Sequence, residues 1–296
     1  MQRKRARRGY FRMRQWTPWL ILLLPIAFTL FLKYYPILKA ARISLYRYDP
    51  VHQPGTFIGL QNYRTMFATR YYWEAWSNTF VFLALQLSMT FFIPIVQALL
   101  LSELGRGQSG FATLYLLPTL IPTTVNVIIW RWVWHPDYGV ANSLVKALGG
   151  QSQLWLSDPR LVKFCIVFPG VIGGGIAVLL YLSAIQGISR EIMESASLDG
   201  CSGFKRLYYI ILPNIRFLIF IQLVMAVSTA MQMLDVPYMF ASGGPSGAST
   251  TQGIYIYNAF QNDFNYGRGS AAAMVLMAVV MLMTVVQLRF ENAEKE

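Results

Sequence analysis

Residues 194–213 read ESASLDGCSGFKRLYYIILP, a stretch that is polar, partly charged and interrupted by glycine. It lies between two long apolar segments in a chain with few charges elsewhere. Its second half predicts an amphipathic helix, because apolar residues recur at i, i+3, i+4 and i+7. These residues are Phe204, Leu207, Tyr208 and Ile211. Such a helix docks in a groove of a water-soluble partner or lies on the lipid surface, and periodicity leaves both alternatives open.

The composition around this stretch is typical of a multi-span membrane protein. Hydrophobic residues make up 55% of the 296 residues and charged residues only 13%, whereas a soluble domain carries about 25% charged residues. Six apolar stretches are long enough to cross a bilayer, which takes about 20 helical residues. They cover residues 18–38, 79–101, 111–134, 164–185, 217–240 and 271–288. Because they are continuously apolar, we predict an all-α membrane protein with six transmembrane helices and not a β-barrel.

Positive charge is concentrated before the first apolar stretch. The formal net charge is +12, and seven of the 25 Lys and Arg residues stand within the first 14 residues. A basic cluster ahead of an apolar span is the usual cytoplasmic flank, so we expect membrane lipid and no nucleic acid as its partner. With six spans, both termini are then cytoplasmic. The inner segments are 1–17, 102–110, 186–216 and 291–296, and the outer segments are 39–78, 135–163 and 241–270.

The polar stretch and the residues before it predict two helices joined by a turn. Ser189 is placed to cap a helix that starts at Arg190. Gly200 is placed to end that helix, because glycine adopts the left-handed conformation without a Cβ penalty. Ser202 is expected to cap the second helix, and Pro213 is expected to end it.

The spacing within this stretch resembles a known signature. ABC importer permeases carry the pattern E-A-A-x3-G-x9-I-x-L-P on a cytoplasmic loop. Glu194, Ala196, Gly200 and Ile210 match it at the right offsets, as do Leu212 and Pro213. Ser195 replaces the middle alanine of the pattern, which is a small change.

The resemblance implies a type I ABC importer transmembrane domain over residues 75–290, preceded by a first helix and outer loop at 18–74. It implies that the 187–214 loop docks on an ATPase subunit and carries its motion to the spans. The residues expected to couple to the ATPase are Glu194, Ala196, Asp199, Gly200, Phe204, Leu207, Ile210, Leu212 and Pro213. The implied partners are a homologous second permease, two ATPase subunits and an extracytoplasmic solute-binding protein, in a bacterial or archaeal plasma membrane.

Outer segments narrow the expected cargo. FIGLQNYRTMF at 57–67, WRWVWHPDYGVANSLVKALG at 130–149 and the 242–273 stretch look like the first of the two permeases in carbohydrate-type importers. They imply a sugar or sugar-like cargo.

The sequence lacks the residue patterns that ATP hydrolysis, catalysis and metal binding require. The chain lacks a G-x-x-x-x-G-K-[ST] phosphate loop, so ATP and Mg²⁺ are expected to act in partner subunits, with no cofactor bound by this chain. Its two histidines and two cysteines form no catalytic or metal-binding pattern. We therefore expect a non-catalytic transporter subunit.

Polar residues inside the spans are candidates for contact with cargo, because unpaired polar groups in lipid are costly. Those predicted to line the substrate pathway are Gln86, Asn126, Trp130, Ser228 and Gln232. The alternative role of such residues is to hold helices together, and tryptophans often belong to an interfacial belt. The fourth apolar stretch holds Pro169 and glycines at 170, 173, 174 and 175, which favour close helix packing or a flexing point.

Other transport classes remain as alternatives. An importer permease for a non-sugar solute shares the loop signature. A secondary transporter driven by ions requires intramembrane carboxylates, of which Asp235 is the only candidate. A membrane enzyme requires clustered catalytic residues, and none are apparent in the sequence.

Overall fold

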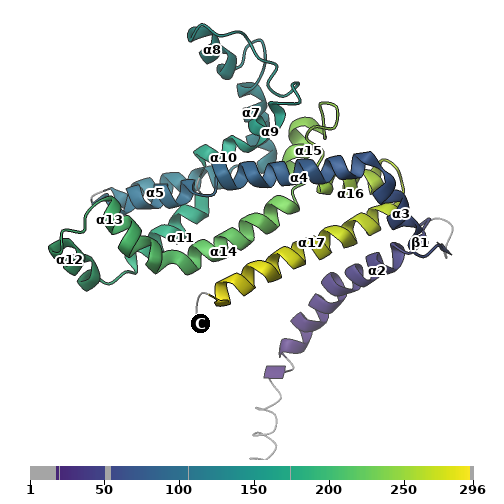
Figure 1. Cartoon of the computed structure of the whole chain (residues 1–296), viewed down its shortest axis with the longest axis horizontal. Coiled ribbons are helices and arrows are strands. Elements are labelled where there is room, and N and C mark those ends of the chain that lie inside the picture. Colours follow the sequence, from purple (N-terminus) through teal and green to yellow (C-terminus); the bar gives the residue numbers. More distant parts are fainter. Residues whose placement is uncertain (1–17, 20, 51–54, 106, 174, 294–296) are drawn as a thin grey trace, which may run out of the picture.

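The computed structural model describes residues 18–19, 21–50, 55–105, 107–173 and 175–293. The predicted basic tail at 1–17 and residues 294–296 lie outside the described residues. The described chain is a bundle of long, tilted helices, with the C-terminal helix on one flank and the first helix diverging from it (Figure 1). Strands β1 (Tyr46–Arg47) and β2 (Thr56–Phe57) pair antiparallel.

The helical elements account for most of the described residues. In the first half they are η1 (Leu30–Tyr34), α2 (Tyr35–Ile43), α3 (Gln61–Ala68), α4 (Arg70–Met89), α5 (Ile93–Ser102), α6 (Gln108–Leu116), η2 (Leu117–Leu120), α7 (Thr123–Val133) and α8 (Val140–Ala147). In the second half they are α9 (Val162–Val167), α10 (Pro169–Ile172), α11 (Gly175–Gln186), α12 (Arg190–Leu198), α13 (Phe204–Arg206), η3 (Leu207–Ile211), α14 (Leu212–Met231), α15 (Asp235–Ala241), α16 (Gln252–Gln261) and α17 (Tyr266–Ala293).

The six predicted spans correspond to four continuous helices and two bent pairs. The continuous spans are Ile21–Ile43, Arg70–Ser102, Phe204–Met231 and Tyr266–Glu291. The bent pairs are Gln108–Leu120 with Thr123–Val133, at 93°, and Val162–Ile172 with Gly175–Gln186, at 45°. Counting each bent pair as one span gives the six that the sequence predicted.

The bends occur where the backbone departs from helical geometry. Ile121 is extended and precedes Pro122, which cannot donate a hydrogen bond to the preceding turn. Gly173 is extended, and Gly175 has a φ of +51°, so this span is broken at the predicted glycine run; Gly174 lies outside the described residues. A Cβ on Gly175 would stand 2.7 Å from Cγ2 of Thr119, so glycine also permits the close approach of the two bent pairs.

The predicted start and end of the fifth span are wrong. We placed this span at 217–240, but the helix runs from Phe204 to Met231 and breaks before α15. Lys205, Arg206 and Arg216 made the start look like a soluble loop, although long basic side chains at the end of a span reach the aqueous phase.

Three hydrophobic clusters organise the bundle. One joins α4, α14, α16 and α17, and a second joins α5, α11, η3 and the start of α14. The third joins α4, α7, α9 and α15 around Phe82 and Cys165. The second cluster therefore occupies one end of the molecule, next to residues 187–214, and the other two lie beyond it.

Buried hydrogen bonds hold the opposite end of the bundle. Asn62 on α3 donates to the carbonyls of Ser44 and Tyr46, at 2.8 and 2.9 Å, which fastens the end of α2. Asn78 on α4 donates to the carbonyls of Gly247 and Thr250, at 2.9 and 3.0 Å, which fastens the loop before α16. Because both amides are buried, each bond is strengthened by the absence of competing water.

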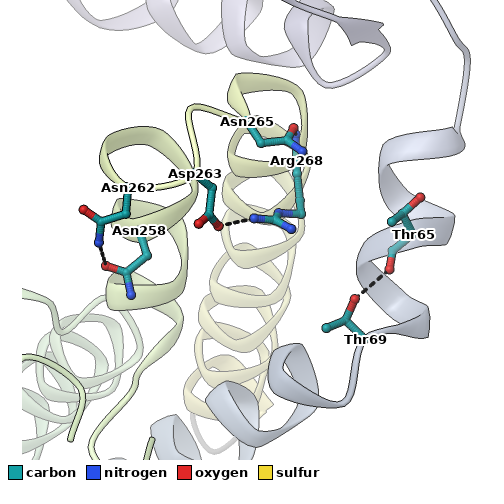
Figure 2. A network of polar contacts seen from close by, with 7 residues as sticks. All are labelled: Thr65, Thr69, Asn258, Asn262, Asp263, Asn265 and Arg268. Carbon is teal, nitrogen blue, oxygen red and sulfur yellow. Dashed lines mark hydrogen bonds and ion pairs between the residues drawn. The ribbon is translucent and has the colours of Figure 1, made fainter.

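The turn between α16 and α17 adds a polar network at the same end (Figure 2). Asp263 pairs with Arg268 across this turn, and Asn262 donates to the side chain of Asn258 at 2.9 Å. Helices α2 and α3, which include described parts of the outer segment predicted at 39–78, also pack on α17.

Candidate functional site

The first helix of the 187–214 loop is capped at both ends as predicted. Ser189 accepts a hydrogen bond from the amide of Ile192 at 3.3 Å, which caps the start of α12. Gly200 has a φ of +75°, and its amide donates to the carbonyl of Ser197 at 3.2 Å. The amide of Cys201 donates to the carbonyl of Ala196 at 2.8 Å. These two bonds form a Schellman motif, so the glycine requirement at position 200 is a backbone requirement.

The second helix of the loop differs from the prediction in two respects. Its N-cap is Gly203, with a φ of +55°, and Ser202 gives no side-chain cap. Pro213 does not end the helix, because it lies in the first turn of α14 and the helix continues to Met231. The π-helical turn η3 precedes the proline, and the amide of Leu212 donates to the carbonyl of Leu207 across that turn. A widened turn leaves room for the proline ring, which would clash in regular α-helix.

The π turn also divides the predicted apolar face. Leu207 and Ile211 pack within the chain against α5 and α11, whereas Phe204 and Tyr208 are exposed. The prediction of one docking face is therefore wrong. The apolar side chains exposed on the loop come from both helices and are Ile192, Leu198, Phe204, Tyr208 and Tyr209. We call these five residues the loop surface.

The structure separates the nine predicted coupling residues into two groups. Exposed residues are Glu194, Asp199, Gly200, Phe204 and Pro213. Residues that are buried or half-buried and support the loop are Ala196, Leu207, Ile210 and Leu212. The signature therefore combines positions that face outward with positions that hold the loop in shape.

Polar contacts fasten the loop to neighbouring segments. Arg206 forms an ion pair with Glu103, which follows α5. Gln186, at the end of α11, donates to Gln108 at 3.0 Å, and Gln108 donates to the carbonyl of Leu101 at 2.8 Å. The loop is thus tied to the end of α5 by an ion pair, and it is continuous with α11 and α14.

A cavity of about 390 Å³ lies at the other ends of these helices. Its polar lining consists of Gln86, Thr90, Thr119, Thr123, Asn126 and Trp130. The rest of the lining is apolar and includes Pro118, Pro169, Gly170, Gly173, Gly175, Met233 and Phe240. We call this space the central cavity.

Four interruptions of the helices meet at the central cavity. They are the turn between α4 and α5 at Thr90, the bend near Thr119, the break at Gly173 and Gly175, and the break between α14 and α15 at Met233. In a membrane, irregular backbone is tolerated where it lines a cavity, because the freed amide and carbonyl groups must find partners. Such interruptions near the middle of a bundle are typical of solute sites in transporters.

The structure brings three of the five predicted pathway residues together. Gln86, Asn126 and Trp130 line the central cavity, and the Oε1 atom of Gln86 is buried without a hydrogen-bond partner among the described residues. Gln232 and Ser228 lie outside it, and the Gln232 amide donates to the Ser228 carbonyl at 2.9 Å. The sequence search missed Thr90, Thr119 and the glycines of the break as lining residues. The signal that pointed to them was the pattern of proline and glycine inside apolar stretches.

Residues of the types that bind metal ions are dispersed over the described chain. Within the described ranges, no three His, Cys, Asp or Glu residues are grouped so that they could hold a metal ion. Cys165 and Cys201 are free. Asp235 is exposed in the first turn of α15, where the helix dipole stabilises a carboxylate.

These features define a class of protein: a helical membrane subunit with a central cavity and a loop that exposes apolar side chains. The chain belongs to the family of binding-protein-dependent transport system inner membrane components, whose model matches residues 3–294. It is therefore a permease subunit of an ATP-driven importer, a non-catalytic, multi-pass component of the bacterial inner membrane.

Curated relatives match over nearly the full chain. The sulfoquinovosyl glycerol transport system permease SmoG of Agrobacterium fabrum is 30% identical, covering 93% of each chain. The trehalose/maltose permease MalF of Thermococcus litoralis is 29% identical, covering 86% of each. The sn-glycerol-3-phosphate permease UgpA of Escherichia coli is 29% identical, covering 97% of each.

Solved structures share the fold. A subunit of a bacterial ABC transporter that imports the acidic polysaccharide alginate superposes with a TM-score of 0.86, covering 98% of this chain and all of that one. A second structure, of an alginate transporter in complex with its alginate-bound periplasmic protein, gives a TM-score of 0.83. Both are 22% identical to this chain. The structural similarity shows that the chain has the type I ABC importer fold.

Proposed function

We propose that this chain forms half of the pore of an importer for a sugar or sugar-like solute, and that its 187–214 loop couples ATP hydrolysis to transport. The loop surface carries this proposal. It exposes five large apolar side chains next to a Schellman turn, on helices that lead directly to the central cavity. Exposed apolar residues of this kind mark a protein interface.

The polarity of the loop surface favours docking on a protein over resting on lipid. Leu198 and Phe204 are each 89% exposed, and they flank the exposed Asp199 and Gly200. A helix that lies on a membrane keeps its apolar residues on one continuous face, whereas here the π turn divides them. The implied partner is an ATPase subunit that supplies ATP and Mg²⁺ chemistry, with this chain binding neither.

The first helix supports pairing with a second, homologous permease. The span Ile21–Ile43 contributes no buried residue within the chain and diverges from the bundle in Figure 1. Within this span, α2 packs on α17. A second permease covers this helix and completes the pore around the central cavity, and two ATPase copies bind the two loops.

The proposed orientation places the 187–214 loop and both termini in the cytoplasm. Glu291, near the end of α17, lines a groove together with Tyr208 and Arg216, so the C-terminal end lies on the side of the loop. The opposite end, with α3 and α16, then faces outward and receives a solute-binding protein.

The cargo is proposed from the cavity and the relatives together. The polar side chains of the central cavity are all uncharged amides, hydroxyls and an indole, which suit a hydroxyl-rich cargo. The relatives named above transport trehalose and maltose, glycerol phosphate and sulfoquinovosyl glycerol, all of which carry several hydroxyl groups or a sugar ring.

Reconstitution tests the proposal. The chain is co-purified with its second permease and ATPase, inserted into liposomes and supplied with its solute-binding protein. Maltose, trehalose, sn-glycerol 3-phosphate and an alginate oligosaccharide are compared with L-histidine as the non-sugar solute. We expect one of the saccharides or polyols to stimulate ATP hydrolysis and to accumulate only with ATP. Failure of the ATPase to associate, or uptake driven by a proton gradient alone, contradicts the proposal; stimulation by histidine alone indicates a non-sugar permease.

A matched pair of glycine variants tests the coupling role of the loop. Gly200 and Gly149 have φ values of +75° and +81°, and a Cβ added at either meets no atom within 4 Å. Valine therefore introduces the same backbone strain at both positions, about 1–2 kcal/mol. We expect Gly200→Val to reduce ATPase association and cargo-stimulated hydrolysis several-fold, and Gly149→Val to leave both unchanged. Equal effects of the two variants would refute a specific role for the loop.

A further inference from the structure

A second cavity of about 350 Å³ lies at the C-terminal end of α7 and against the loop that follows α8. The residues that matter for its chemistry are Arg131, Trp132, Trp134, His135, Tyr138 and Ser157. We call it the outer pocket, because most of its lining comes from the 135–163 segment that we expect to face outward. Helices α7 and α8 project from the side of the bundle, apart from α12 and α13 (Figure 1).

Aromatic rings form one wall of the outer pocket. The ring of His135 stacks on Tyr138 with centroids 3.5 Å apart, and Tyr138 meets Trp132 edge to face at 5.9 Å. Trp132 is 65% exposed and Tyr138 is 62% exposed, so each has surface available for a ligand.

The polar groups beside this wall are mainly hydrogen-bond donors. The Nε1 atom of Trp134 is buried and has no partner among the described residues. His135 accepts a hydrogen bond from the amide of Asp137 at Nδ1, at 3.2 Å, so its neutral ring carries the proton on Nε2. Arg131 contributes a guanidinium, and Ser157 adds a hydroxyl that both donates and accepts.

Among the described residues that line the outer pocket, Arg131 is the one Lys, Arg, Asp or Glu residue, and it lies in the last turn of α7, where the helix dipole offsets part of its charge. Donors next to aromatic faces suit the hydroxyl oxygens and the apolar ring face of a saccharide.

One buried side chain holds the outer pocket in shape. Asn142 donates to the carbonyls of Pro136 and Gln153, at 2.7 and 3.0 Å. Its Oδ1 atom accepts from the amide of Gln153 at 3.0 Å and from Nε1 of Trp155 at 2.8 Å. All its hydrogen-bonding capacity is thus used to fix the loop that lines the outer pocket, which is preorganised as a binding site requires.

The outer pocket and the central cavity share an aromatic wall. Trp134 lines the outer pocket and Trp130 lines the central cavity. Their rings stack with centroids 5.8 Å apart and planes 30° apart.

We propose that the outer pocket is a second saccharide site on the transport path, where a sugar ring packs against Trp132 and Tyr138 before it passes the Trp130–Trp134 pair. Its hydroxyls accept hydrogen bonds from Arg131, from Trp134 Nε1 and from His135 Nε2. This inference rests on the proposed function, because it requires a cargo with a sugar ring or several hydroxyl groups.

Site-specific protection tests this site in the assembled transporter. Trp132→Cys is introduced into a Cys201→Ser background, where the other native cysteine, Cys165, is buried. The control is Trp73→Cys, since Trp73 is also exposed and lies outside the outer pocket, in the first turn of α4. The measured quantity is the rate of maleimide labelling with solute-binding protein, with and without the saccharide or polyol that stimulates ATP hydrolysis. We expect cargo to slow labelling at position 132 at least fivefold and to leave position 73 unchanged.

The outcomes separate this inference from the proposed function. If the transporter imports its cargo but labelling at position 132 is the same with and without cargo, the outer pocket is not on the path. If labelling is slow in liposomes under both conditions and fast in detergent, Trp132 belongs to a lipid belt and the inference is wrong. If no saccharide or polyol stimulates hydrolysis, the proposed function fails and this inference fails with it.

A functional variant provides an independent readout. Trp132→Ala should reduce the transport rate about fivefold at saturating loaded binding protein, whereas Trp132→Phe retains an aromatic face and should preserve most of it. Assembly with the ATPase shows whether each variant is folded. Equal transport by wild type and Trp132→Ala would overturn the proposal.

Discussion

The two ends of this permease, the outer end and the end that carries the 187–214 loop, differ in the contacts that hold their loops. At the outer end, Asn62, Asn78 and Asn142 are buried, and each makes at least two hydrogen bonds to backbone carbonyls. At the other end, large apolar side chains such as Leu198 and Phe204 are almost fully exposed. The ties there are an ion pair with partly exposed members and a glutamine pair.

This difference shows which end holds its shape by itself and which end exposes a surface that a partner stabilises. A loop held by buried amides keeps its shape without a partner, because breaking those bonds leaves unpaired polar groups. A surface of exposed apolar residues gains free energy only when a partner covers it. The loops of the outer end are therefore fixed by contacts within the chain, whereas the loop surface is stabilised only in an interface.

The largest expected effect is on the stability of the outer end. Asn78→Ala removes two buried hydrogen bonds and leaves the carbonyl of Gly247 with only its bond from the Thr250 amide among the described residues, so we expect a loss of about 2–3 kcal/mol in the free energy of unfolding. Thermal unfolding of the purified chain in detergent measures it. Asn262→Ala is the control, since Asn262 is exposed and bonds only to the Asn258 side chain among the contacts described above. Similar small shifts for both variants would show that the outer end does not depend on buried amides.

The next effect concerns association at the loop end. Leu198 and Leu148 are both 89% exposed, one on the loop surface and one after α8 at the outer end. Burying a leucine stabilises a complex by about 2 kcal/mol, so Leu198→Asp should weaken ATPase binding about 30-fold. Leu148→Asp should not change it. Affinity is measured by titrating ATPase onto the permease in nanodiscs, and unaltered binding of the Leu198 variant would remove the loop surface from the interface.

A smaller effect is expected in the central cavity, which lies between the two ends. Gln86 and Gln97 each have a buried Oε1 atom without a partner, but only Gln86 lines the cavity. Replacement by leucine removes an unpaired group, so neither variant should lower thermal stability. Gln86→Leu should reduce transport about fivefold, equivalent to about 1 kcal/mol for one lost hydrogen bond to cargo. Equal transport by the two variants would argue that cargo does not contact Gln86.

The smallest effect is expected from the ion pair that ties the loop to α5. Partly exposed ion pairs contribute about 0–1 kcal/mol, so Glu103→Gln should lower cargo-stimulated ATP hydrolysis no more than about threefold. The reduction should diminish at high salt. Glu74→Gln disrupts the Arg70–Glu74 pair on the outer part of α4 and should have no effect on coupling. A tenfold loss with the Glu103 variant would show that this contact, and not the helix packing, transmits the motion.

Local features of the loop were predictable because they depend on neighbouring residues. The cap at Ser189 and the left-handed Gly200 follow from short-range backbone chemistry, and the structure confirms both. The role of Pro213 was wrong, because the π turn that accommodates it is favoured by packing of Leu207 and Ile211 on distant helices. Ser202 lost the cap position to Gly203, whose positive φ no pattern in the sequence indicated.

The central cavity was only partly predictable. Gln86, Asn126 and Trp130 stood out as polar or amphipathic groups inside apolar stretches, and all three line it. Ser228 and Gln232 stood out equally but bond to each other along their own helix, and nothing in a linear pattern distinguishes the two cases. The stacking of Trp130 on Trp134 follows from their i, i+4 spacing, whereas the cavities that the two rings line form only in the tertiary structure.

The sequence by itself determined the number of spans, the caps of the first loop helix and the family signature, because each depends on composition or on residues close in the chain. The tertiary structure decided where the helix interruptions meet, which loop residues face outward and how Asn142 shapes the outer pocket. These features arise from contacts between segments far apart in the chain, whose relative positions are set by packing of the whole bundle. The stretch at 194–213 illustrates both contributions. Its spacing identifies the loop from sequence, and packing against α5 and α11 determines which of its side chains stay exposed.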